Sequence, residues 1–508
     1  MNRTASFSDT RSTRPTGYLR PTWQEAVAGH LPGSWRGERC VRWIDRLPLA
    51  AVLAVYVAMC ARLDNTAFID EARAISAGRH VLLPGTAGDL GFTPPGVAQL
   101  YPVAAAALDA VGGLHLARLL SCVSVGVAVV ALASAVTRAT SSTITGLFAA
   151  CAFAVTAPVV FVGALATPDA VCLALLAVAV WTAMARSLTT AAVTGLLLAV
   201  AVTVAYIAAL FVPVVLLAIL FARTGRAAAE SPPARLAIAL AVAIGSFAAL
   251  QLLAGDEVRR GLAVTFRSLG APGTGAPWGA AVLDIGLLVM AAAAGTVAAA
   301  RTGTRGAAAC GLLLAGLALP LVHLLTGSAT SFDQHNAYAA LLLAPMAGYG
   351  LAVLSRQLFR VIPVVVALVL ALVPAFSRSE ALFHQWSDVS VVMADIAAHP
   401  QPGTYLSVAS DAFAYHARAI PDVRWEATSA LYARGATAVR RAVAERRYQV
   451  IVLRTASTAG PDQEVLLNAL TRSADYEPDP LAQPTDHVRD EWLVYRLVNT
   501  LPWTGGTG

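Results

Sequence analysis

Residues 115–137 read HLARLLSCVSVGVAVVALASAVT, and residues 143–165 read TITGLFAACAFAVTAPVVFVGAL. A helix needs roughly 20 residues to cross about 30 Å of hydrocarbon, because each residue rises by about 1.5 Å. Each of these two runs is therefore long enough to span a bilayer. The 508-residue chain as a whole is 57% hydrophobic and only 13% charged, which excludes a disordered chain, a coiled coil and an ordinary soluble enzyme.

Similar apolar runs recur along the chain. The run at residues 188–222 is too long for one helix and carries Tyr206 and Pro213 near its middle, so we predict two short spans joined by a tight turn. The predicted fold class is therefore mainly α: a polytopic membrane protein with about eleven transmembrane helices. The other predicted spans are residues 48–63, 115–137, 143–165, 168–185, 234–254, 279–300, 306–325, 337–355 and 361–377.

The arginines between the spans predict the orientation. All 36 basic residues are Arg. This excludes a P-loop or a lysine Schiff base, because each needs the amine of a lysine. Eight of the arginines lie in residues 1–46. This Arg-rich segment has no pattern that would bury a core, so we expect a disordered tail. Other arginines recur in alternate loops, which the excess of positive charge on the inner side assigns to the cytoplasm. We therefore predict a multi-pass plasma-membrane protein with a cytoplasmic N-terminus.

Three domains follow from this pattern. They are the tail at residues 1–46, a transmembrane domain at residues 47–377, and residues 378–508, which an odd number of spans places outside the cytoplasm. In the last segment, strand-like runs at residues 404–410, 448–455 and 491–497 alternate with helical stretches. This alternation predicts a small extracytoplasmic α/β domain.

Carboxylates mark a candidate site at the outer face. The stretch Ala67-Phe68-Ile69-Asp70-Glu71-Ala72-Arg73 opens the first outer loop. Adjacent carboxylates on a helix point about 100° apart, so Asp70 and Glu71 would divide the work: one meets a substrate hydroxyl while the other holds a metal ion or an Arg. The alternative is a solvated acidic pair at a helix start, where negative charge suits the helix dipole.

Asp169 is the third candidate. It follows Thr167-Pro168 at the outer entrance of the fourth span, and Pro and Asp together also make a good helix start. The functional interpretation is favoured because Asp169, Asp70 and Glu71 share one face of the membrane, where charges near membrane depth are costly and usually functional.

Arginines on the outer side run against the cytoplasmic bias. Guanidinium groups match phosphate oxygens in two-point contacts, so these residues are candidates for binding a lipid phosphate. The alternative is that Arg73 and Arg79 only pair with nearby acids or lipid headgroups. The candidates are Arg73, Arg79, Arg259, Arg260 and Arg267, with His80, His335 and Tyr338 as weaker ones.

Taken in order, these motifs resemble the GT-C superfamily of polyprenyl-phosphate-sugar-dependent glycosyltransferases, in particular its protein O-mannosyltransferase and aminoarabinose-transferase branch. The likeness covers residues 47–377. One departure is Thr93, which stands where some relatives have a Lys that holds the lipid phosphate. The matching motifs are Phe68-Ile69-Asp70-Glu71-Ala72-Arg73, Phe92-Thr93-Pro94-Pro95, Tyr101-Pro102, Leu114-His115-Leu116-Ala117-Arg118, Thr167-Pro168-Asp169-Ala170, and His335-Asn336-Ala337-Tyr338 with Pro345.

The resemblance implies an inverting transfer of a sugar from a polyprenyl-phosphate donor to an acceptor hydroxyl on a glycan, lipid or protein. Asp70 would be the general base. Glu71 and Asp169 would hold a divalent cation (Mg²⁺ or Mn²⁺) or orient the site, and Arg259 or Arg260 would face the phosphate leaving group. The partners implied are the donor, the acceptor and the lipid bilayer, with no nucleic acid.

Two other classes of function stay open at this point. One is a lipid-linked sugar flippase or secondary transporter, against which the acids at the outer edge of the spans count. Such proteins often show repeated halves, which the sequence does not reveal. A non-catalytic membrane scaffold whose outer domain binds a partner is the other alternative.

Overall fold

The computed structural model describes residues 46–83, 100–221, 231–254, 262–263, 278–301, 304–328, 331–357, 361–454, 461–479 and 492–498. Arg259, Arg260 and Arg267, the Pro-rich stretch at residues 92–95 and nearly all of the predicted tail lie outside these ranges. The chain divides into two compact units, Met1–Ala51 and Val52–Gly508. All contacts given below lie within the second unit.

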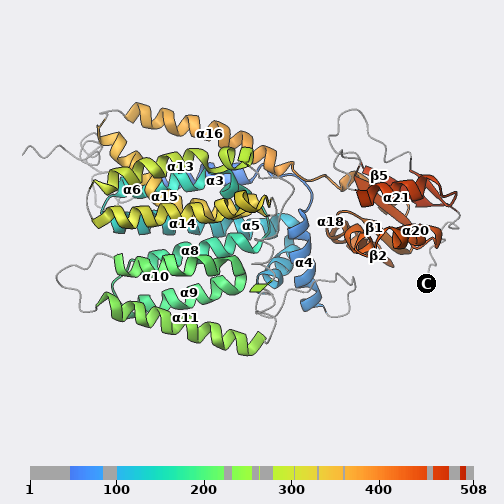
Figure 1. Ribbon diagram of the computed structural model, residues 1–508, viewed down its shortest axis with the longest axis horizontal. Coiled ribbons are helices and arrows are strands. Elements are labelled where there is room, and N and C mark those ends of the chain that lie inside the picture. Colours follow the sequence, from blue (N-terminus) through green and yellow to red (C-terminus); the bar gives the residue numbers. More distant parts are fainter. Residues whose placement is uncertain are drawn as a thin grey trace, which may run out of the picture. The chain divides into compact units, whose positions relative to one another are not determined.

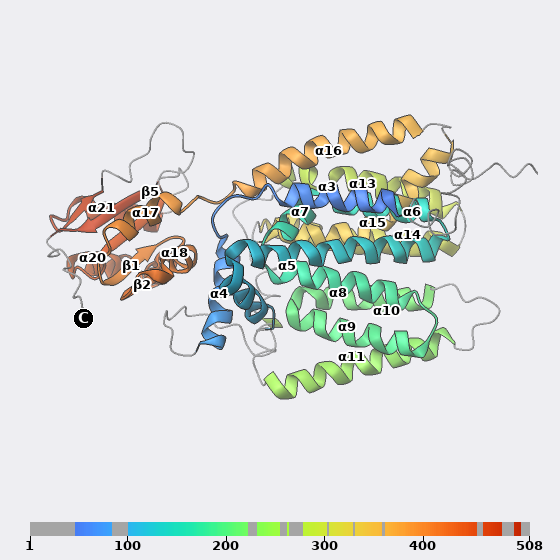
Figure 2. The same ribbon diagram turned by 180° about the vertical axis from the view of Figure 1, so that it is seen from behind.

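Long apolar helices make up the first part of the chain, and those drawn in green and yellow lie side by side (Figures 1 and 2). Helices occupy all the runs that the sequence predicts to span the membrane. Their bounds are α3 Leu47–Cys60, α5 Leu100–Thr140, α6 Thr143–Ala154, α7 Ala157–Ala164, α8 Pro168–Ala183, α9 Leu188–Val204, α10 Val212–Phe221, α11 Pro232–Ala254, α13 Trp278–Ala300, α14 Thr304–Thr326, α15 Phe332–Gln357 and α16 Val361–Phe383.

The chain is a multi-pass membrane protein, as predicted. Among the described residues, five helices are long and apolar enough to cross a bilayer, and the pair α6–α7, bent by 67°, forms a sixth span if it is counted as one. Shorter apolar helices lie in the predicted runs at residues 48–63, 168–185 and 188–222, and the 23-residue helix α16 covers the run at residues 361–377. The predicted division of residues 188–222 has its counterpart in α9, the 3-10 helix η3 (Tyr206–Phe211) and α10. The number of crossings, eleven, stays a prediction.

The described residues of the predicted first outer loop are largely helical. They include α4 (Ile69–Leu82), which packs against α5. Within α5, Gly112 and Gly113 leave helical geometry, and the φ of +67° at Gly113 is one that glycine adopts without steric cost. This break separates the start of α5, which belongs to the outer loop, from the apolar run that begins near Leu114.

Helices α13 and α15 approach each other closely through glycine. A Cβ built on Gly295 would lie 1.9 Å from the backbone oxygen of Met346, and one on Gly350 would lie 2.8 Å from that of Ala291. Small residues allow such contact between membrane helices, where lipid offers no hydrophobic drive for association. The packing of α15, which carries part of the site below, therefore depends on Gly295.

The C-terminal domain has a five-stranded sheet of order β2-β1-β3-β5-β4, in which β1 pairs in parallel with β2 and β3, while β5 is antiparallel to β3 and β4. This confirms the predicted small C-terminal sheet. The bounds are α17 Ser390–Ala398, β1 Gly403–Ser407, α18 Ser410–His416, η4 Ala417–Ala419, β2 Val423–Ala427, α19 Thr428–Tyr432, α20 Ala436–Ala444, β3 Val450–Arg454, α21 Pro461–Thr471, β4 Tyr476–Pro478 and β5 Trp492–Leu497.

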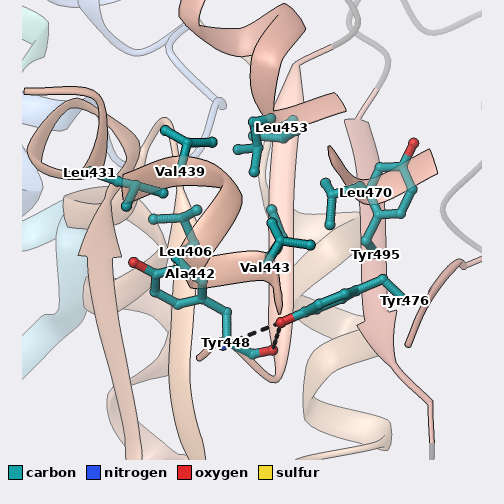
Figure 3. Close-up of a cluster of buried hydrophobic side chains, with 12 residues drawn as sticks. Leu406, Leu431, Val439, Ala442, Val443, Tyr448, Leu453, Leu470, Tyr476 and Tyr495 are labelled. Carbon is teal, nitrogen blue, oxygen red and sulfur yellow. Dashed lines mark hydrogen bonds between the residues drawn. The ribbon is translucent and has the colours of Figure 1, made fainter. Parts of the chain in front are cut away.

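Side chains alternate between the two faces of this sheet, and helices cover both faces, so each face has its own buried core. In β3, Ile451 and Leu453 point into one core with α20 and α21, while Val450 and Val452 point into a second core with α17 and α18. Figure 3 shows the first core, in which the Tyr476 hydroxyl donates to the carbonyl of Tyr448 at 2.8 Å. Strands were predicted at residues 404–410, 448–455 and 491–497, which overlap β1 and contain β3 and β5, whereas the short strands β2 and β4 were missed.

Substitution of Gly295 by Ala is expected to lower the free energy of unfolding by about 1–3 kcal/mol, because the added methyl group forces two backbones apart. The matched control is Gly311→Ala in α14, where an added Cβ meets no described atom within 4 Å. That change should be neutral or stabilise by up to about 1 kcal/mol, since Ala favours helix. Thermal unfolding in detergent compares the two. Equal midpoints would contradict the packing described here.

Candidate active site

Glu71 is part of the start of α4. Its Oε2 accepts a hydrogen bond from the backbone N–H of Phe68 at 2.8 Å, which satisfies one of the free donors at the helix N-terminus. Asp70 and Glu71 both lie in the first turn, where negative charge is favourable. Locally, Glu71 therefore stabilises the start of a helix, which is the alternative that the sequence left open for this acidic pair.

Glu71 also forms a buried ion pair with Arg118 of α5. The Arg118 guanidinium donates from Nε to Oε1 at 2.9 Å and from Nη2 to Oε2 at 2.8 Å, and the Glu71 side chain is fully buried. The backbone N–H of Ala166 adds a third donor, at 2.7 Å from Oε1. Arg118 further donates to the carbonyls of Asn65 and Thr66. Glu71 thus joins α4, α5 and the connection between α7 and α8.

The donor set around Glu71 bears on the predicted cation. Four hydrogen bonds from three groups occupy its two oxygens, and one of those groups is itself a cation. Asp169, the other predicted ligand, accepts a hydrogen bond through Oδ1. In the described part of the chain, no three His, Cys, Asp or Glu side chains gather as a metal site would require. These residues do not fit a metal centre, and a divalent cation stays a prediction from the resemblance.

Asp70 and Asp169 are brought to one face of α15. The Gln334 amide donates to Asp70 Oδ2 at 3.3 Å, and the Tyr338 hydroxyl donates to Asp169 Oδ1 at 2.7 Å. Gln334 and Tyr338 are four residues apart, so they lie one helical turn apart on the same face. Asp70 and Asp169 are accordingly within electrostatic range of each other.

The surroundings of Asp169 are rigid. It lies in the first turn of α8, which begins at Pro168. Its partner Tyr338 is fully buried and stacks on Phe211 of η3, with ring centroids 5.4 Å apart. Stacking and the hydrogen bond together fix the phenol. The break between α9 and α10 therefore supplies a wall of the site.

Asp70 remains accessible, with 36% of its side-chain surface exposed. Burial of the carboxylate against neighbouring protein nevertheless raises its pKa, and the negative charges of Asp411 and Glu71 act in the same direction. Arg73, at 3.5 Å, and the Gln334 amide oppose this shift. A carboxylate with a raised pKa is a stronger base than a free aspartate.

The outer arginines of α4 pair with carboxylates. Arg79 Nη2 lies 2.5 Å from Oδ2 of Asp109, whose side chain is fully buried, and Arg73 Nη2 lies 2.9 Å from Asp411. Asp109 also accepts from Arg418 at 2.9 Å and from the Tyr415 hydroxyl at 2.6 Å. Arg73 and Arg79 therefore pair with nearby acids, which is the alternative to a lipid phosphate that the sequence left open.

Three of these contacts come from the C-terminal domain. Asp411 and Tyr415 belong to α18, and Arg418 belongs to η4. In addition, the His416 Nε2 accepts from the backbone N–H of Ala67 at 3.2 Å, just before α4 begins. Because α18 contacts α4 directly, the carboxylate site and the C-terminal domain lie on the same side of the membrane.

The remaining predicted residues are placed as follows. His335 faces His323 of α14, with Nδ1 and Nε2 2.7 Å apart, and the His323 Nδ1 lies 2.9 Å from the carbonyl of Ser328. His80 is exposed near the end of α4. Arg259, Arg260 and Arg267 lie outside the described residues, so their predicted contact with phosphate stays a prediction.

Sequence reasoning missed Arg118, Gln334 and Asp411 as residues of the site. Arg118 carried a usable signal, because it is the one charged residue in the predicted span at residues 115–137. Gln334 stands four residues before Tyr338, which is a weaker signal. Asp411 had none, since its contact depends on how the C-terminal domain docks.

The comparisons with known proteins agree with this architecture. No protein-family model and no curated protein matches the sequence. Among solved structures, ArnT from Cupriavidus metallidurans bound to undecaprenyl phosphate has a TM-score of 0.56 at 13% identity, over 90% of this chain and 98% of that one. The apo state of that protein gives a TM-score of 0.53, also at 13% identity and with the same coverage.

A third solved structure, the Archaeoglobus fulgidus oligosaccharyltransferase in complex with zinc and sulfate, has a TM-score of 0.47 at 12% identity, over 79% of this chain and 68% of that one. The likeness to ArnT shows the fold. The chain shares the fold of ArnT, which is a fold of the kind that its motifs predict.

Glu71→Gln is expected to lower the free energy of unfolding by about 3 kcal/mol or more, because it leaves the buried Arg118 without its counter-charge. The matched control is Glu380→Gln, which removes the more exposed partner of Arg62 and should cost less than about 1 kcal/mol. Thermal unfolding is measured with Mg²⁺, with Mn²⁺ and with a chelator. A bracing role predicts the same loss in all three. A loss confined to the samples with a cation would instead support Glu71 as a metal ligand.

Proposed function

We propose that this protein is a membrane glycosyltransferase that moves a sugar from a polyprenyl-phosphate donor to an acceptor hydroxyl on the outer face of the plasma membrane. The observation that carries the proposal is the meeting of Asp70 and Asp169 on one face of α15, in a fold shared with ArnT. The acceptor is a glycan, lipid or protein, and the sugar a hexose or pentose.

Asp70 is assigned as the general base. More than a third of its side-chain surface is exposed, and its raised pKa makes it a stronger base than a free aspartate. Asp70 takes the proton of the acceptor hydroxyl as that oxygen forms a bond to the anomeric carbon. The bond from that carbon to the phosphate oxygen breaks, and polyprenyl phosphate leaves with the electron pair. One displacement of this kind inverts the anomeric centre.

Asp169 is assigned a role in orienting the site. Tyr338 holds one of its oxygens, which leaves the other for a sugar hydroxyl beside Asp70. Glu71 is assigned to the frame that positions Asp70, because its own oxygens are occupied. Tyr338 of α15 holds Asp169 in place by its hydrogen bond. His335 of the same helix contacts His323 of α14 and is assigned a role in packing these two helices.

The leaving phosphate needs positive charge where its own negative charge grows. Arg79 is held by the buried Asp109, and Arg73 is shared between two carboxylates. The phosphate contact therefore falls first to Arg259 and Arg260, which follow α11 in the sequence. A divalent cation, if one binds, would supply further positive charge at the leaving phosphate.

Two observations support the donor class and the side of the membrane. ArnT, whose fold this chain shares, is bound to undecaprenyl phosphate in its crystal structure. A long polyprenyl tail cannot leave the lipid, so an enzyme that uses it must have its site at membrane depth. The arginine pattern of the loops supports a position of α4 and the C-terminal domain outside the cytoplasm.

Asp70→Asn should reduce sugar transfer by at least 10²-fold because it removes the proton acceptor, while the loss of its partly exposed contact with Arg73 should cost less than about 1 kcal/mol of stability. The acceptor is first identified by mass spectrometry of surface glycans and lipids from cells with and without the protein. Transfer is then measured with purified protein in nanodiscs that is given polyprenyl-phosphate sugars and this acceptor. The control is Asp64→Asn, an exposed acid of the same loop. Full activity of the Asp70 variant would refute the assignment, and donor movement between leaflets without transfer would favour the flippase.

The dependence of activity on pH tests the same residue. A base works only when it is deprotonated, so kcat/KM should fall as the pH falls through the pKa of Asp70. Because burial raises that pKa, this loss should occur at a higher pH than for a free aspartate. The profile is measured over the range in which intrinsic fluorescence shows the protein folded. A profile without an acid limb above the range of a free aspartate would contradict the role of Asp70.

A further inference from the structure

One arginine is shared between the candidate base and the C-terminal domain. The Arg73 guanidinium lies 3.5 Å from Asp70 Oδ1 through Nη1, and 2.9 Å from Asp411 Oδ2 through Nη2. Asp70 and Arg73 are three residues apart on α4, whereas Asp411 lies at the start of α18. The shorter contact, which is a hydrogen bond, is the one to the C-terminal domain.

The position of Asp411 is fixed by the docking of α18 and η4 on the outer loop. Tyr415 and Arg418 both donate to the fully buried Asp109, and His416 accepts from the backbone of Ala67. Hydrogen bonds to a buried carboxylate are strong and directional. The Asp411 side chain itself is only 14% exposed, so it meets Arg73 as part of a packed surface.

The contact between Asp411 and Arg73 affects the charge that surrounds Asp70. Among the described residues, Arg73 is the cation that faces Asp70, and Gln334 donates a neutral hydrogen bond. In the same part of the chain, Asp411, Glu71 and Asp169 are negative groups within electrostatic range. The charge of Glu71 is balanced by its own bidentate partner Arg118. The positive charge that Asp70 meets is therefore set mainly by how Arg73 is divided between Asp70 and Asp411.

We propose that Asp411 is a positioning residue for the proposed reaction: by holding Arg73, it limits the positive charge that reaches Asp70 and so keeps Asp70 an effective base. This inference rests on the proposed function of Asp70. It makes the C-terminal domain a part of the catalytic apparatus as well as an outer module, because a domain that undocks takes Asp411 with it and leaves Arg73 to neutralise Asp70.

Asp411→Asn tests the proposal, since the amide still accepts a hydrogen bond from Arg73 but carries no charge. The acid limb of the pH–kcat/KM profile should move down by about 0.5–1 pH unit, because Arg73 then acts on Asp70 alone. A weaker base should also lower the plateau of kcat by roughly threefold, with little change in KM for the donor. Asp411→Glu keeps the charge and should keep the limb at its wild-type position.

The matched control is Asp422→Asn, which makes the same chemical change at an exposed position of the same domain. Asp422 has a φ of +60°, a conformation that Asn also adopts readily. This variant should reproduce the wild-type profile. A limb that moves equally in both variants would show a general effect of domain charge and would overturn the proposal, as would a limb that stays in place in Asp411→Asn.

A second measurement does not need sugar transfer. Carbodiimides react with the protonated form of a carboxylic acid, so the pH dependence of Asp70 modification, followed by peptide mass spectrometry, reports its protonation directly. In Asp411→Asn the midpoint should shift down by the same amount. If the wild-type protein transfers no sugar but this midpoint shifts, the proposed function fails while the link from Asp411 to Asp70 stands. If the midpoint stays in place, the link itself is refuted.

Discussion

The buried ion pair between Glu71 and Arg118 is the interaction on which the outer end of this protein depends. It joins the start of α4 to α5 and, through the Ala166 N–H, to the connection that leads into Asp169. A buried charge without its partner is costly, so these three segments are held in one arrangement. Asp70 is placed by that frame without taking part in it. The adjacent carboxylates thus differ in role because the helix turns by about 100° between them: one is enclosed by donors, and the other is left open to the site.

The membrane part of the fold was readable from the sequence, because apolar length and the positions of Arg are local properties. Helices occupy every run predicted to span, and even the division near Tyr206 could be anticipated from length and Pro213. The C-terminal sheet was also predicted, from strand-like runs that contain β3 and β5 and overlap β1. Two strands were missed. In β2, apolar residues alternate with Arg424 and Glu426, and this signal was overlooked, whereas β4 has only three residues, too few to show a pattern.

The candidate site was predicted in part. Asp70 and Asp169 stood out because acids near membrane depth are rare, but the residues that bring them together could not be found in the same way. Gln334 and Tyr338 act through their spacing on α15, some 165 residues or more beyond Asp169, and only the packing of that helix makes the spacing meaningful. The outer arginines were harder still: a guanidinium suits a phosphate and a carboxylate equally, so the choice between them rests on Asp109 and Asp411, whose proximity is a result of the tertiary fold.

The docking of α18 has a consequence for how such a protein can be rearranged. Asp109, at the start of α5, receives one arginine from α4, Arg79, and two donors, Tyr415 and Arg418, from the distant C-terminal domain. A chimera that borrowed the outer module of another transferase would leave this carboxylate half satisfied in a place that water does not reach. The C-terminal domain and the loop that it contacts must therefore be exchanged as one unit. An exchange between relatives would succeed only when α4, the start of α5 and α18 are transferred together.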